Sequence, residues 1–258
     1  MRIADWTSIV GRRSIDNVRV AGRSVIFLLE SLSYGFMPPL KLKRILDQIV
    51  FIGARSMSII LITGAFTGMV LGLQGYYTLR KFGSEGLLGS AVALAIIREL
   101  GPVLSALMVT GRAGSSMTAE IGIMKITEQI SALEMMAVNP IKHVVTPKLF
   151  AGLFSLPLLT ALFDVVGIFG GYVVGVKLLG VNEGAYFGEM ARAVELMDVT
   201  GGFVKSVVFG LTISWICSLI GYTSTATTEG VATATTNAVV VTSVTVLILD
   251  YILTSFLL

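Results

Sequence analysis

The most constraining feature of this sequence is a stretch of twenty-four residues without a charged side chain, Ser56–Leu79. As an α-helix, such a stretch is long enough to cross the roughly 30 Å hydrocarbon core of a membrane. The rest of the chain has the same character, because 54% of its 258 residues are apolar and only 14% are charged. Soluble domains carry about 25% charged residues. The sequence therefore predicts an all-α integral membrane protein.

Further apolar stretches predict four more transmembrane helices. We place the five spans at about residues 56–79, 86–111, 149–176, 206–222 and 237–257. The last two come from one long run, Ser206–Leu249, in which Glu229 is the only charged residue. That run is too long for a single crossing, and we predict that the Thr-rich stretch Thr223–Thr236 divides it as a loop. Residues 49–258 then form the transmembrane domain.

Residues 1–48 are basic and have a different pattern, in which arginines alternate with apolar residues. This pattern predicts an amphipathic helix lying in the membrane interface, with a solvated tail as the alternative. The residues that form it are Arg2, Arg12, Arg13, Arg19 and Arg23 with Ile3, Trp6, Ile9, Val10, Val18 and Val25. No cleavable signal peptide is evident, because the apolar stretch Ser24–Met37 contains Glu30 and lacks a small-residue cleavage site.

The distribution of Lys and Arg predicts the orientation of the chain, because cytoplasmic loops are enriched in these residues. Basic residues precede the first span and surround the loop after the second, whereas acidic residues offset them in the loops after the first and third spans. We therefore expect the N-terminus in the cytoplasm and, with five spans, the C-terminus outside. The Thr-rich stretch has no Lys or Arg and does not bear on this orientation.

The strongest polar signal within the spans is the motif RELGP at residues 98–102. A charge inside a span costs at least about 2.5–3.5 kcal/mol and usually faces a cavity or a partner. Pro102 has no N–H, so the carbonyl of Arg98 loses its helical partner. With Arg98 and Glu99 at the middle of the second span, two interpretations stay open: a cavity site for a charged headgroup, or a structural polar cluster. Asp164 is a candidate partner for Arg98.

A short amphipathic helix is predicted at about residues 127–139, between the second and third spans. Thr127 is a candidate N-cap before Glu128, and Asn139-Pro140 ends the helix. Its apolar residues at helical spacing are Ile130, Leu133, Met136 and Ala137. That face lies on the lipid surface or docks into a groove on a soluble partner. Glu128 and Glu134 fit poorly against an anionic leaflet, which favours the protein partner.

The first and third spans share the pattern G-x-F-x-G-x-V-x-G, at residues 64–72 and 167–175. Glycines four residues apart form a smooth stripe that lets another helix backbone approach closely. We therefore predict that these two spans pack tightly along their stripes, which are formed by Gly64, Gly68 and Gly72 and by Gly167, Gly171 and Gly175.

No motif for a cofactor is present in the sequence. It contains no G-x-x-x-x-G-K-[ST] cradle for nucleotide phosphates, so ATP and Mg²⁺ would be bound by a partner subunit if transport is ATP-driven. A single His, His143, and a single Cys, Cys217, disfavour a metal site. Near the outer end of the first span, Tyr76 and Tyr77 fit the aromatic belt of a membrane interface, and Gln74 is a candidate for the mouth of a cavity. We expect no nucleic-acid partner.

Several motifs together resemble the MlaE/YrbE family of permeases. They are LGLQGY (71–76), RELGP (98–102), GRAGSSMTAEIG (111–122), EQISALEMMAVNP (128–140) and SLPLLT (155–160). The resemblance spans roughly residues 45–258 with the motifs in matching order, while the N-terminal arm matches only in character. It implies the permease subunit of an ABC transporter in a Gram-negative inner membrane, which moves phospholipids between that membrane and periplasmic carriers and maintains outer-membrane lipid asymmetry.

The resemblance also implies partners for the chain. Permeases of this family form homodimers with a cytoplasmic ABC ATPase (MlaF-like), which binds ATP, and with a STAS-domain protein (MlaB-like). A hexameric MCE-domain protein (MlaD-like) sits on the periplasmic side. No covalent chemistry is expected of the permease itself.

Roles for individual residues follow from the same resemblance. The coupling helix that contacts the ATPase would use Glu128, Leu133, Glu134, Met135, Met136, Asn139 and Pro140. The lipid cavity at the dimer interface would be lined by Leu71, Gln74, Tyr76, Leu79, Arg98 and Glu99. The loop before the fifth span is Thr-rich here, where relatives can carry basic residues, so no headgroup role is carried over to it.

Two other functions fit parts of the sequence. A secondary transporter could couple flux to protons through Glu99 and Asp164, because broken spans with intramembrane charges suit such transporters. A membrane scaffold for soluble subunits would keep its function after Glu99→Ala or Leu71→Glu. Asp250, the remaining acidic residue of the last span, is expected to reach the outer interface.

Overall fold

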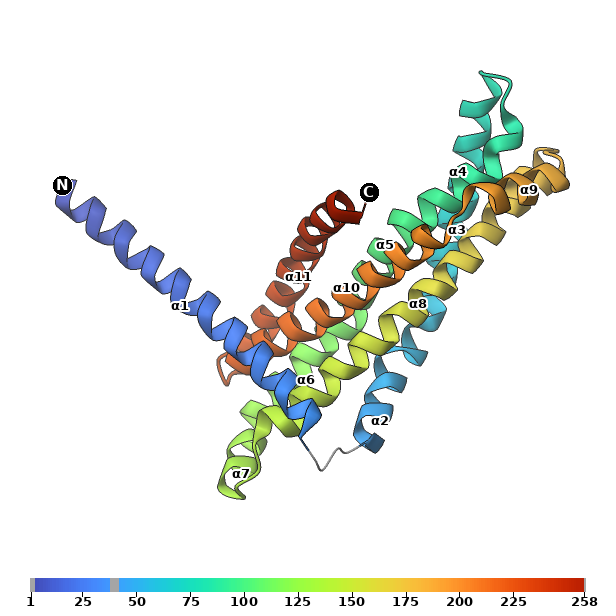
Figure 1. Ribbon diagram of the computed structural model, residues 1–258. Coiled ribbons are helices and arrows are strands. Elements are labelled where there is room, and N and C mark those ends of the chain that lie inside the picture. The colour runs from blue at the N-terminus through green and yellow to red at the C-terminus, as the bar shows by residue number, and fades with distance from the viewer. Residues whose placement is uncertain (1–2, 38–41, 258) are drawn as a thin grey trace.

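The computed structural model of this protein describes residues 3–37 and 42–257, without the side chains of residues 3–17, 20 and 21. Every regular element in the described ranges is a helix (Figure 1). Five helical segments are long and apolar enough to cross a membrane. The predicted fold class, an all-α membrane protein with about five spans, is confirmed.

Two helices occupy the N-terminal region: α1 (Ile3–Phe36) and α2 (Leu42–Ile52). A short turn, η1 (Ala54–Ser56), joins α2 to α3 (Met57–Arg80), so that the first membrane-length segment covers Leu42–Arg80. The predicted domain boundary at residue 48 therefore falls inside α2. The arginines before residue 18 that suggested an amphipathic helix have side chains outside the described part of the chain.

The second membrane-length segment, Glu85–Ile126, changes helix type along its length. Its elements are η2 (Glu85–Leu87), α4 (Leu88–Ala95), the π-helical η3 (Ile96–Leu100), α5 (Gly101–Val109), the π-helical η4 (Thr110–Gly114) and α6 (Ser115–Ile126). The helix continues past residue 111, where the predicted span ends, because the following charges find partners within the helix bundle. Arg112 Nη1 donates to the carbonyl of Phe51 at 2.6 Å, and Lys125 Nζ donates to that of Ser224 at 2.6 Å.

The third segment, Ile141–Leu178, also begins earlier than predicted. After α7 (Gln129–Met135) the chain forms the π-helical η5 (Ile141–Val145), α8 (Thr146–Tyr172) and the π-helical η6 (Val173–Leu178). Lys148 marked the predicted start, yet only 1% of its side chain is exposed. Its ammonium group is paired at 2.6 Å with Glu120 on α6. A buried and paired lysine therefore continues the helix.

The predicted Thr-rich loop is largely helical. After α9 (Glu183–Ala193), α10 (Leu196–Thr223) ends at the start of that stretch and α11 (Thr228–Leu257) already begins inside it. Only residues 224–227 break the helix. The hydroxyls of Thr233 and Thr236 donate to carbonyls one turn earlier, at 3.0 and 3.3 Å. These bonds satisfy the threonines inside a helix and explain why the prediction of a long loop was wrong.

The central element of the bundle is α8, which packs against α3, α10 and α2 (Figure 1). α11 packs on α10 and α6, and α9 packs against α4 at the far end of the bundle. The C-terminal half of α1 is attached to the other helices through backbone carbonyls. Thr146 Oγ1 donates to the carbonyl of Ser31 at 3.1 Å, and Trp215 Nε1 donates to that of Ser24 at 3.0 Å.

The glycine stripes of α3 and α8 face each other over most of their length. Gly68 lies against the backbone of Gly167, so that a methyl group at Gly68 would overlap the Gly167 carbonyl. A Cβ atom at Gly72 would lie 3.0 Å from the carbonyl oxygen of Gly171. Gly64 faces Phe163 in the same way, whereas Gly175 faces Leu88 of α4 rather than α3. We call the contact between these two helices the glycine seam.

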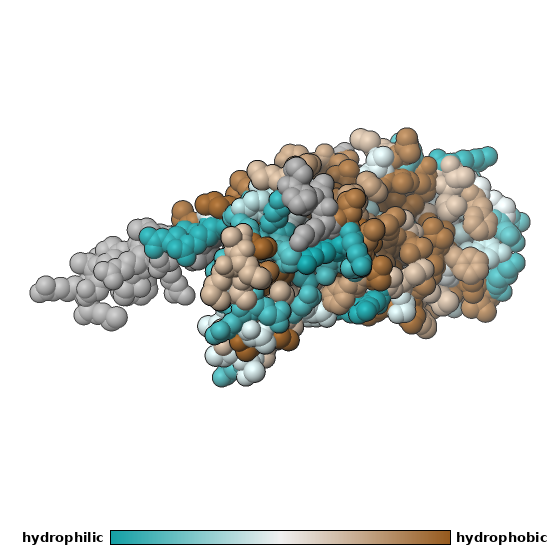
Figure 2. Space-filling model, turned by 90° about the horizontal axis from the view of Figure 1, so that it is seen from below, coloured by the Kyte–Doolittle hydropathy of each residue, from teal (hydrophilic) through white to brown (hydrophobic). Residues whose placement is uncertain are grey.

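The surface of the molecule has the distribution that a membrane protein requires. Hydrophobic residues cover much of the bundle, and hydrophilic residues gather toward the end that carries α9 and the end that carries α7 (Figure 2). Exposed apolar side chains lie along α3, α8 and α11, including Ile62, Phe66, Leu158 and Tyr251. An apolar surface of this extent needs lipid or another protein against it.

Candidate functional site

The RELGP motif lies where the second membrane segment departs from α-helical geometry. Residues Ile96–Leu100 form the π-helix η3, and Pro102 follows in the first turn of α5. Because Pro102 has no N–H, the carbonyl of Arg98 is free to accept a hydrogen bond from outside its own helix. Lys205 on α10 donates this bond through Nζ at 2.8 Å. Single-turn π segments of this kind are frequent at functional sites.

Lys205 is the centre of the resulting charge cluster. Only 3% of its side chain is exposed. Its Nζ atom donates to Glu99 Oε2 at 2.8 Å and to Thr254 Oγ1 at 2.7 Å, and it lies 3.3 Å from a carboxylate oxygen of Asp250. Thr254 Oγ1 in turn lies 3.2 Å from Glu99 Oε1. The ammonium group is therefore enclosed by oxygen atoms from the second segment and from α11.

A second ion pair extends the charge cluster. Arg98 Nε donates to Asp198 Oδ1 at 2.7 Å, and Asp198 Oδ2 accepts from the backbone N–H of Glu195 at 3.0 Å. Asp198 and Glu195 thereby form a capping box at the start of α10. The side chain of Arg98 remains 40% exposed. We define the charge cluster as Arg98, Glu99, Asp198, Lys205 and Asp250, which together carry two positive and three negative formal charges.

The position of this cluster corrects one prediction. Asp198 lies in the first turn of α10 and Thr254 lies in the last turn of α11. The charges therefore lie toward one end of these two helices and not halfway along a span. The hollow beside them is small, about 40 Å³ within one chain. This space suits a water molecule, and one chain alone cannot enclose a phospholipid there.

Two acidic residues behave differently from the prediction. Asp164 does not pair with Arg98, because Arg98 pairs with Asp198. Instead Asp164 lies against Gly101, and its Oδ1 has no hydrogen-bond partner among the described residues. Asp250, expected at the outer interface, faces Lys205 inside the bundle.

The predicted lipid-binding residues fall into two separate groups. Arg98 and Glu99 line the small hollow, whereas Leu71, Tyr76 and Leu79 of α3 are half-buried and pack against the hydrophobic core. Gln74 is exposed on the same helix. None of these α3 residues lines the hollow beside the charge cluster in a single chain.

The predicted coupling helix is shorter than expected and has a different N-cap. α7 comprises Gln129–Met135, and Thr127 ends α6 instead of capping α7. Glu128 takes the N-cap position with a left-handed φ of 56°, and Ala137 turns the chain back with a φ of 57°. Such conformations are uncommon outside glycine and mark sharp changes of direction. α7 is thus a separate short element at one end of the bundle (Figure 1).

The seven predicted coupling residues have two kinds of surroundings. Glu128, Glu134, Met135 and Met136 are exposed, with 84% of Met135 and 64% of Met136 accessible, while Leu133 is half-buried. Asn139 instead binds within the chain: its Nδ2 donates to Tyr34 Oη at 2.9 Å, and its Oδ1 accepts from the N–H of Ile141 at 2.9 Å. Pro140 is buried beside it. The first group is free to contact a partner, and the second fixes the start of the third segment.

Sequence reasoning missed the partners in the charge cluster. The sequence predicts an outer loop that ends near Lys205, yet Asp198 and Lys205 are seven residues apart and therefore share one face of a helix. Asp250 and Thr254 are four residues apart and do the same. This spacing is the sequence feature from which the partners in the charge cluster could have been predicted. Among the described residues, no group of three His, Cys, Asp or Glu side chains is arranged to hold a metal ion.

Comparison with known proteins identifies relatives over nearly the whole chain. The family model described as Permease MlaE matches residues 45–256. The intermembrane phospholipid transport system permease protein MlaE of Haemophilus influenzae is 44% identical over 256 residues, which is 99% of this chain and 98% of that protein. A probable ABC transporter permease protein of Rickettsia typhi is 40% identical over 97% of this chain and 96% of its own length.

A more distant relative comes from a plant. The chloroplastic protein trigalactosyldiacylglycerol 1 of Arabidopsis thaliana is 33% identical over 83% of this chain and 61% of its own length. The family match covers most of the chain, including the charge cluster and α7. This chain is therefore a member of the MlaE permease family.

Proposed function

We propose that this chain is the membrane subunit of an ABC transporter that moves phospholipids between the bacterial inner membrane and periplasmic carriers, and so maintains outer-membrane lipid asymmetry. The observation that carries the proposal is the 44% identity over nearly the whole chain to a protein named for intermembrane phospholipid transport. The charge cluster supports it, because a partly buried set of charged side chains on helices with exposed apolar residues suits a ligand with a charged headgroup and apolar tails.

Transport by this chain requires a second copy of it. The hollow beside the charge cluster holds about 40 Å³, whereas sites that enclose whole ligands usually measure about 300–1,000 Å³. A homodimer would enlarge this hollow into a lipid cavity. It would do so by bringing together the exposed residues of α3 and the charge clusters of two copies. Arg98, with its partly exposed guanidinium, would then meet the lipid phosphate as a charge-assisted donor.

Energy for transport would come from a partner ATPase. The exposed end of α7, with Glu134, Met135 and Met136, would dock into a groove on that ATPase. ATP and Mg²⁺ would bind to the ATPase, so the permease itself needs no cofactor. With α7 in the cytoplasm, α9 and the C-terminus face the periplasm, where a hexameric MCE-domain protein would receive the lipid. A STAS-domain protein would bind the ATPase.

The experiment that tests this function uses the complete transporter reconstituted in vesicles with fluorescent phospholipid. We expect ATP-dependent lipid transfer to fall about tenfold in Arg98→Ala, because one charge-assisted contact of about 1.4 kcal/mol is lost. The matched control is Arg192→Ala, which breaks a surface ion pair with Glu189 on α9. Transfer that needs a proton gradient and no ATP would overturn the proposal in favour of a secondary transporter through Glu99 and Asp164. Unchanged transfer in Arg98→Ala would exclude the headgroup role.

A further inference from the structure

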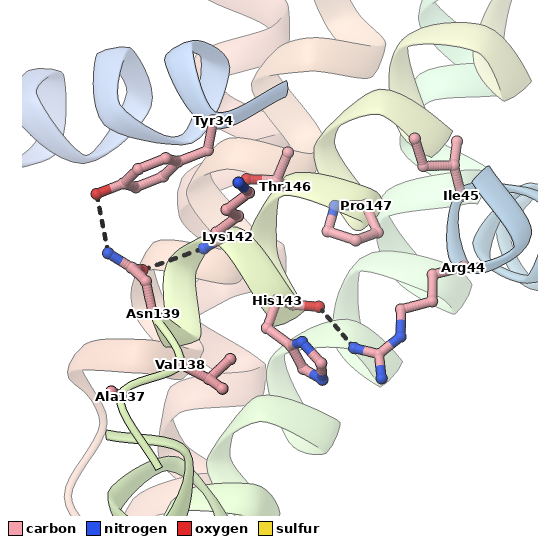
Figure 3. Close-up of a pocket in the computed structure, with 10 residues that line it drawn as sticks. All are labelled: Tyr34, Arg44, Ile45, Ala137, Val138, Asn139, Lys142, His143, Thr146 and Pro147. Carbon is pink, nitrogen blue, oxygen red and sulfur yellow. Dashed lines mark hydrogen bonds between the residues drawn. The ribbon is translucent and has the colours of Figure 1, made fainter. Parts of the chain in front are cut away.

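A second cavity lies at the opposite end of the bundle from the charge cluster. It measures about 360 Å³ and is enclosed by α1, α2 and the segment that leads into α8 (Figure 3). Tyr34 comes from α1 and Arg44 from α2, while Asn139, Lys142 and His143 come from the third wall (Figure 3). None of its lining residues belongs to the charge cluster. Its volume falls within the range of small-ligand sites, about 300–1,000 Å³.

The charged side chains that line this cavity are basic. They are Arg44 and Lys142, with the imidazole of His143 beside them, and no Asp or Glu is among the described lining residues. Three acidic residues lie close by without lining the cavity. Glu30 accepts the Tyr34 hydroxyl at 3.0 Å, and Asp47 and Glu120 line a neighbouring hollow that Arg44 and His143 also border. Glu120 is paired there with Lys148 at 2.6 Å. The cavity therefore favours an anionic ligand.

Arg44 is suited to bind a phosphate. Its Nη1 donates to the carbonyl of His143 at 3.3 Å, which fixes the guanidinium against the cavity wall (Figure 3). A guanidinium has five N–H donors, so this bond leaves most of the group for a ligand. Two of the remaining donors can bind phosphate oxygens in parallel, the geometry in which arginine binds phosphate most strongly.

The walls of the cavity are held together before any ligand binds. Asn139 Nδ2 donates to Tyr34 Oη at 2.9 Å, and Asn139 Oδ1 accepts from the backbone N–H of Lys142 at 3.2 Å (Figure 3). Thr146 Oγ1 donates to the carbonyl of Ser31 at 3.1 Å. These bonds join α1 to the start of α8. A preformed site loses less conformational entropy when a ligand binds.

Apolar side chains accompany the basic ones. Ile45, Val138 and Pro147 line the cavity itself. The ends of α1 and α2 that enclose it also carry exposed Phe36, Met37, Leu42 and Leu46. A basic cavity with exposed apolar neighbours fits an amphipathic anion better than a small soluble one. Basic pockets between membrane helices on the cytoplasmic side bind the headgroups of anionic lipids.

We propose that this cavity binds the phosphate group of one anionic phospholipid per chain, taken from the cytoplasmic leaflet and not transported. The proposal rests on the orientation given with the proposed function, which places α7 in the cytoplasm. The bound lipid joins α1, α2 and the start of α8 directly beside α7. It therefore stabilises the part of the permease that contacts the ATPase and is a structural lipid, distinct from the cargo at the charge cluster.

The test uses the complete transporter in detergent with added phosphatidylglycerol, and native mass spectrometry counts the lipids that each complex retains. In the double variant Arg44→Gln/Lys142→Gln we expect one lipid fewer per permease chain and an apparent Kd at least about tenfold weaker, because charge-assisted contacts to the phosphate are lost. The matched control is Lys43→Gln, which removes one exposed charge from the same helix without touching the cavity. A second variant, Arg44→Lys with Lys142 unchanged, keeps both charges and should retain part of the binding.

Three outcomes would each overturn the proposal. Equal lipid counts in the wild type and the double variant would show that the cavity holds no lipid. Arg44-dependent stabilisation by inorganic phosphate, without any effect of phosphatidylglycerol, would make a soluble anion the ligand. Loss of the ATPase from the double variant with its lipid count unchanged would make the cavity a protein contact. Arg98→Ala should leave this lipid in place, so failure of the transport proposal would be recognised separately.

Discussion

At the scale of single residues, the charge cluster depends on one buried cation. Lys205 is almost fully enclosed and is the only positive group within 4 Å of Glu99 and Asp250 in the described structure. Removing one partner from a buried ion pair is far more damaging than removing an exposed pair, because the remaining charges stay desolvated. The enclosure of Lys205 favours a structural role for that residue, and the partly exposed Arg98 is the member of the cluster that we propose meets a lipid headgroup.

We expect Lys205→Met to destabilise the folded permease by about 3 kcal/mol, the lower end for a broken buried pair since Glu99 is partly exposed. The measurement is the thermal unfolding temperature of the purified protein in detergent. Lys177→Met is the control, because Lys177 forms an exposed pair with Glu183 at 3.6 Å, and it should change stability by less than about 1 kcal/mol. Equal unfolding temperatures for wild type and Lys205→Met would show that the cluster contributes no stability.

At the scale of elements, the glycine seam brings the backbones of α3 and α8 into direct contact. The two helices run in the same direction, since Gly64, Gly68 and Gly72 meet Phe163, Gly167 and Gly171 in order. In lipid, helix association relies on close packing because the solvent is as apolar as the side chains. The seam is therefore the contact on which the central part of the bundle depends most.

Gly68→Val should disrupt this contact. The new side chain would overlap the Gly167 carbonyl, and a backbone atom cannot rotate away, so we expect a loss of about 3 kcal/mol or more and poor insertion. The control is Gly188→Val on α9, where nothing lies within 4 Å of a new Cβ atom. Yield and monodispersity in detergent report the outcome. A Gly68→Val protein as stable as the control would mean that α3 and α8 are not in direct contact.

The elements also show what sequence could predict. The five spans and the paired glycine stripes followed from hydrophobicity and from spacing along one helix. The ends of the spans did not, because Arg112, Lys125 and Lys148 find partners on distant helices that no local pattern reveals. The same reason explains the missed charge cluster, where Lys205 and Glu99 are separated by more than one hundred residues. The sequence also could not predict that Asp164 Oδ1 has no hydrogen-bond partner among the described residues.

At the scale of the whole molecule, the two ends of the bundle carry different structural features. One end holds α7 and the basic cavity, and the other holds α9 and the end of α11 near the charge cluster (Figure 1). A transporter driven by a partner ATPase needs this polarity, because the energy enters at one face and the cargo leaves at the other. The two proposed lipid sites lie at opposite ends of the bundle: the basic cavity beside α7 and the charge cluster near the end of α11.

The polarity predicts where the ATPase binds. Glu134→Lys reverses a charge on the exposed side of α7, and we expect at least about tenfold weaker retention of the ATPase during purification, while the permease folds normally. Glu183→Lys, an exposed reversal on α9 at the opposite end, serves as the control. Quantitative mass spectrometry of the co-purified subunits measures both. Normal retention in Glu134→Lys would place α7 on the lipid surface instead.

The glycine seam has a mechanical consequence. At Gly68 and Gly167 the backbones of the two helices touch without side chains between them, so sliding or rolling would drive carbonyls and Cα atoms into overlap. On α8 the contact covers residues 163–171, which lie beyond Pro157, so we expect this half of α8 to move together with α3 as one unit. The parts of the permease that move during transport must then lie outside this contact. We expect the parts that move to include the π-helical turns of the second and third segments and α11, of which little is buried.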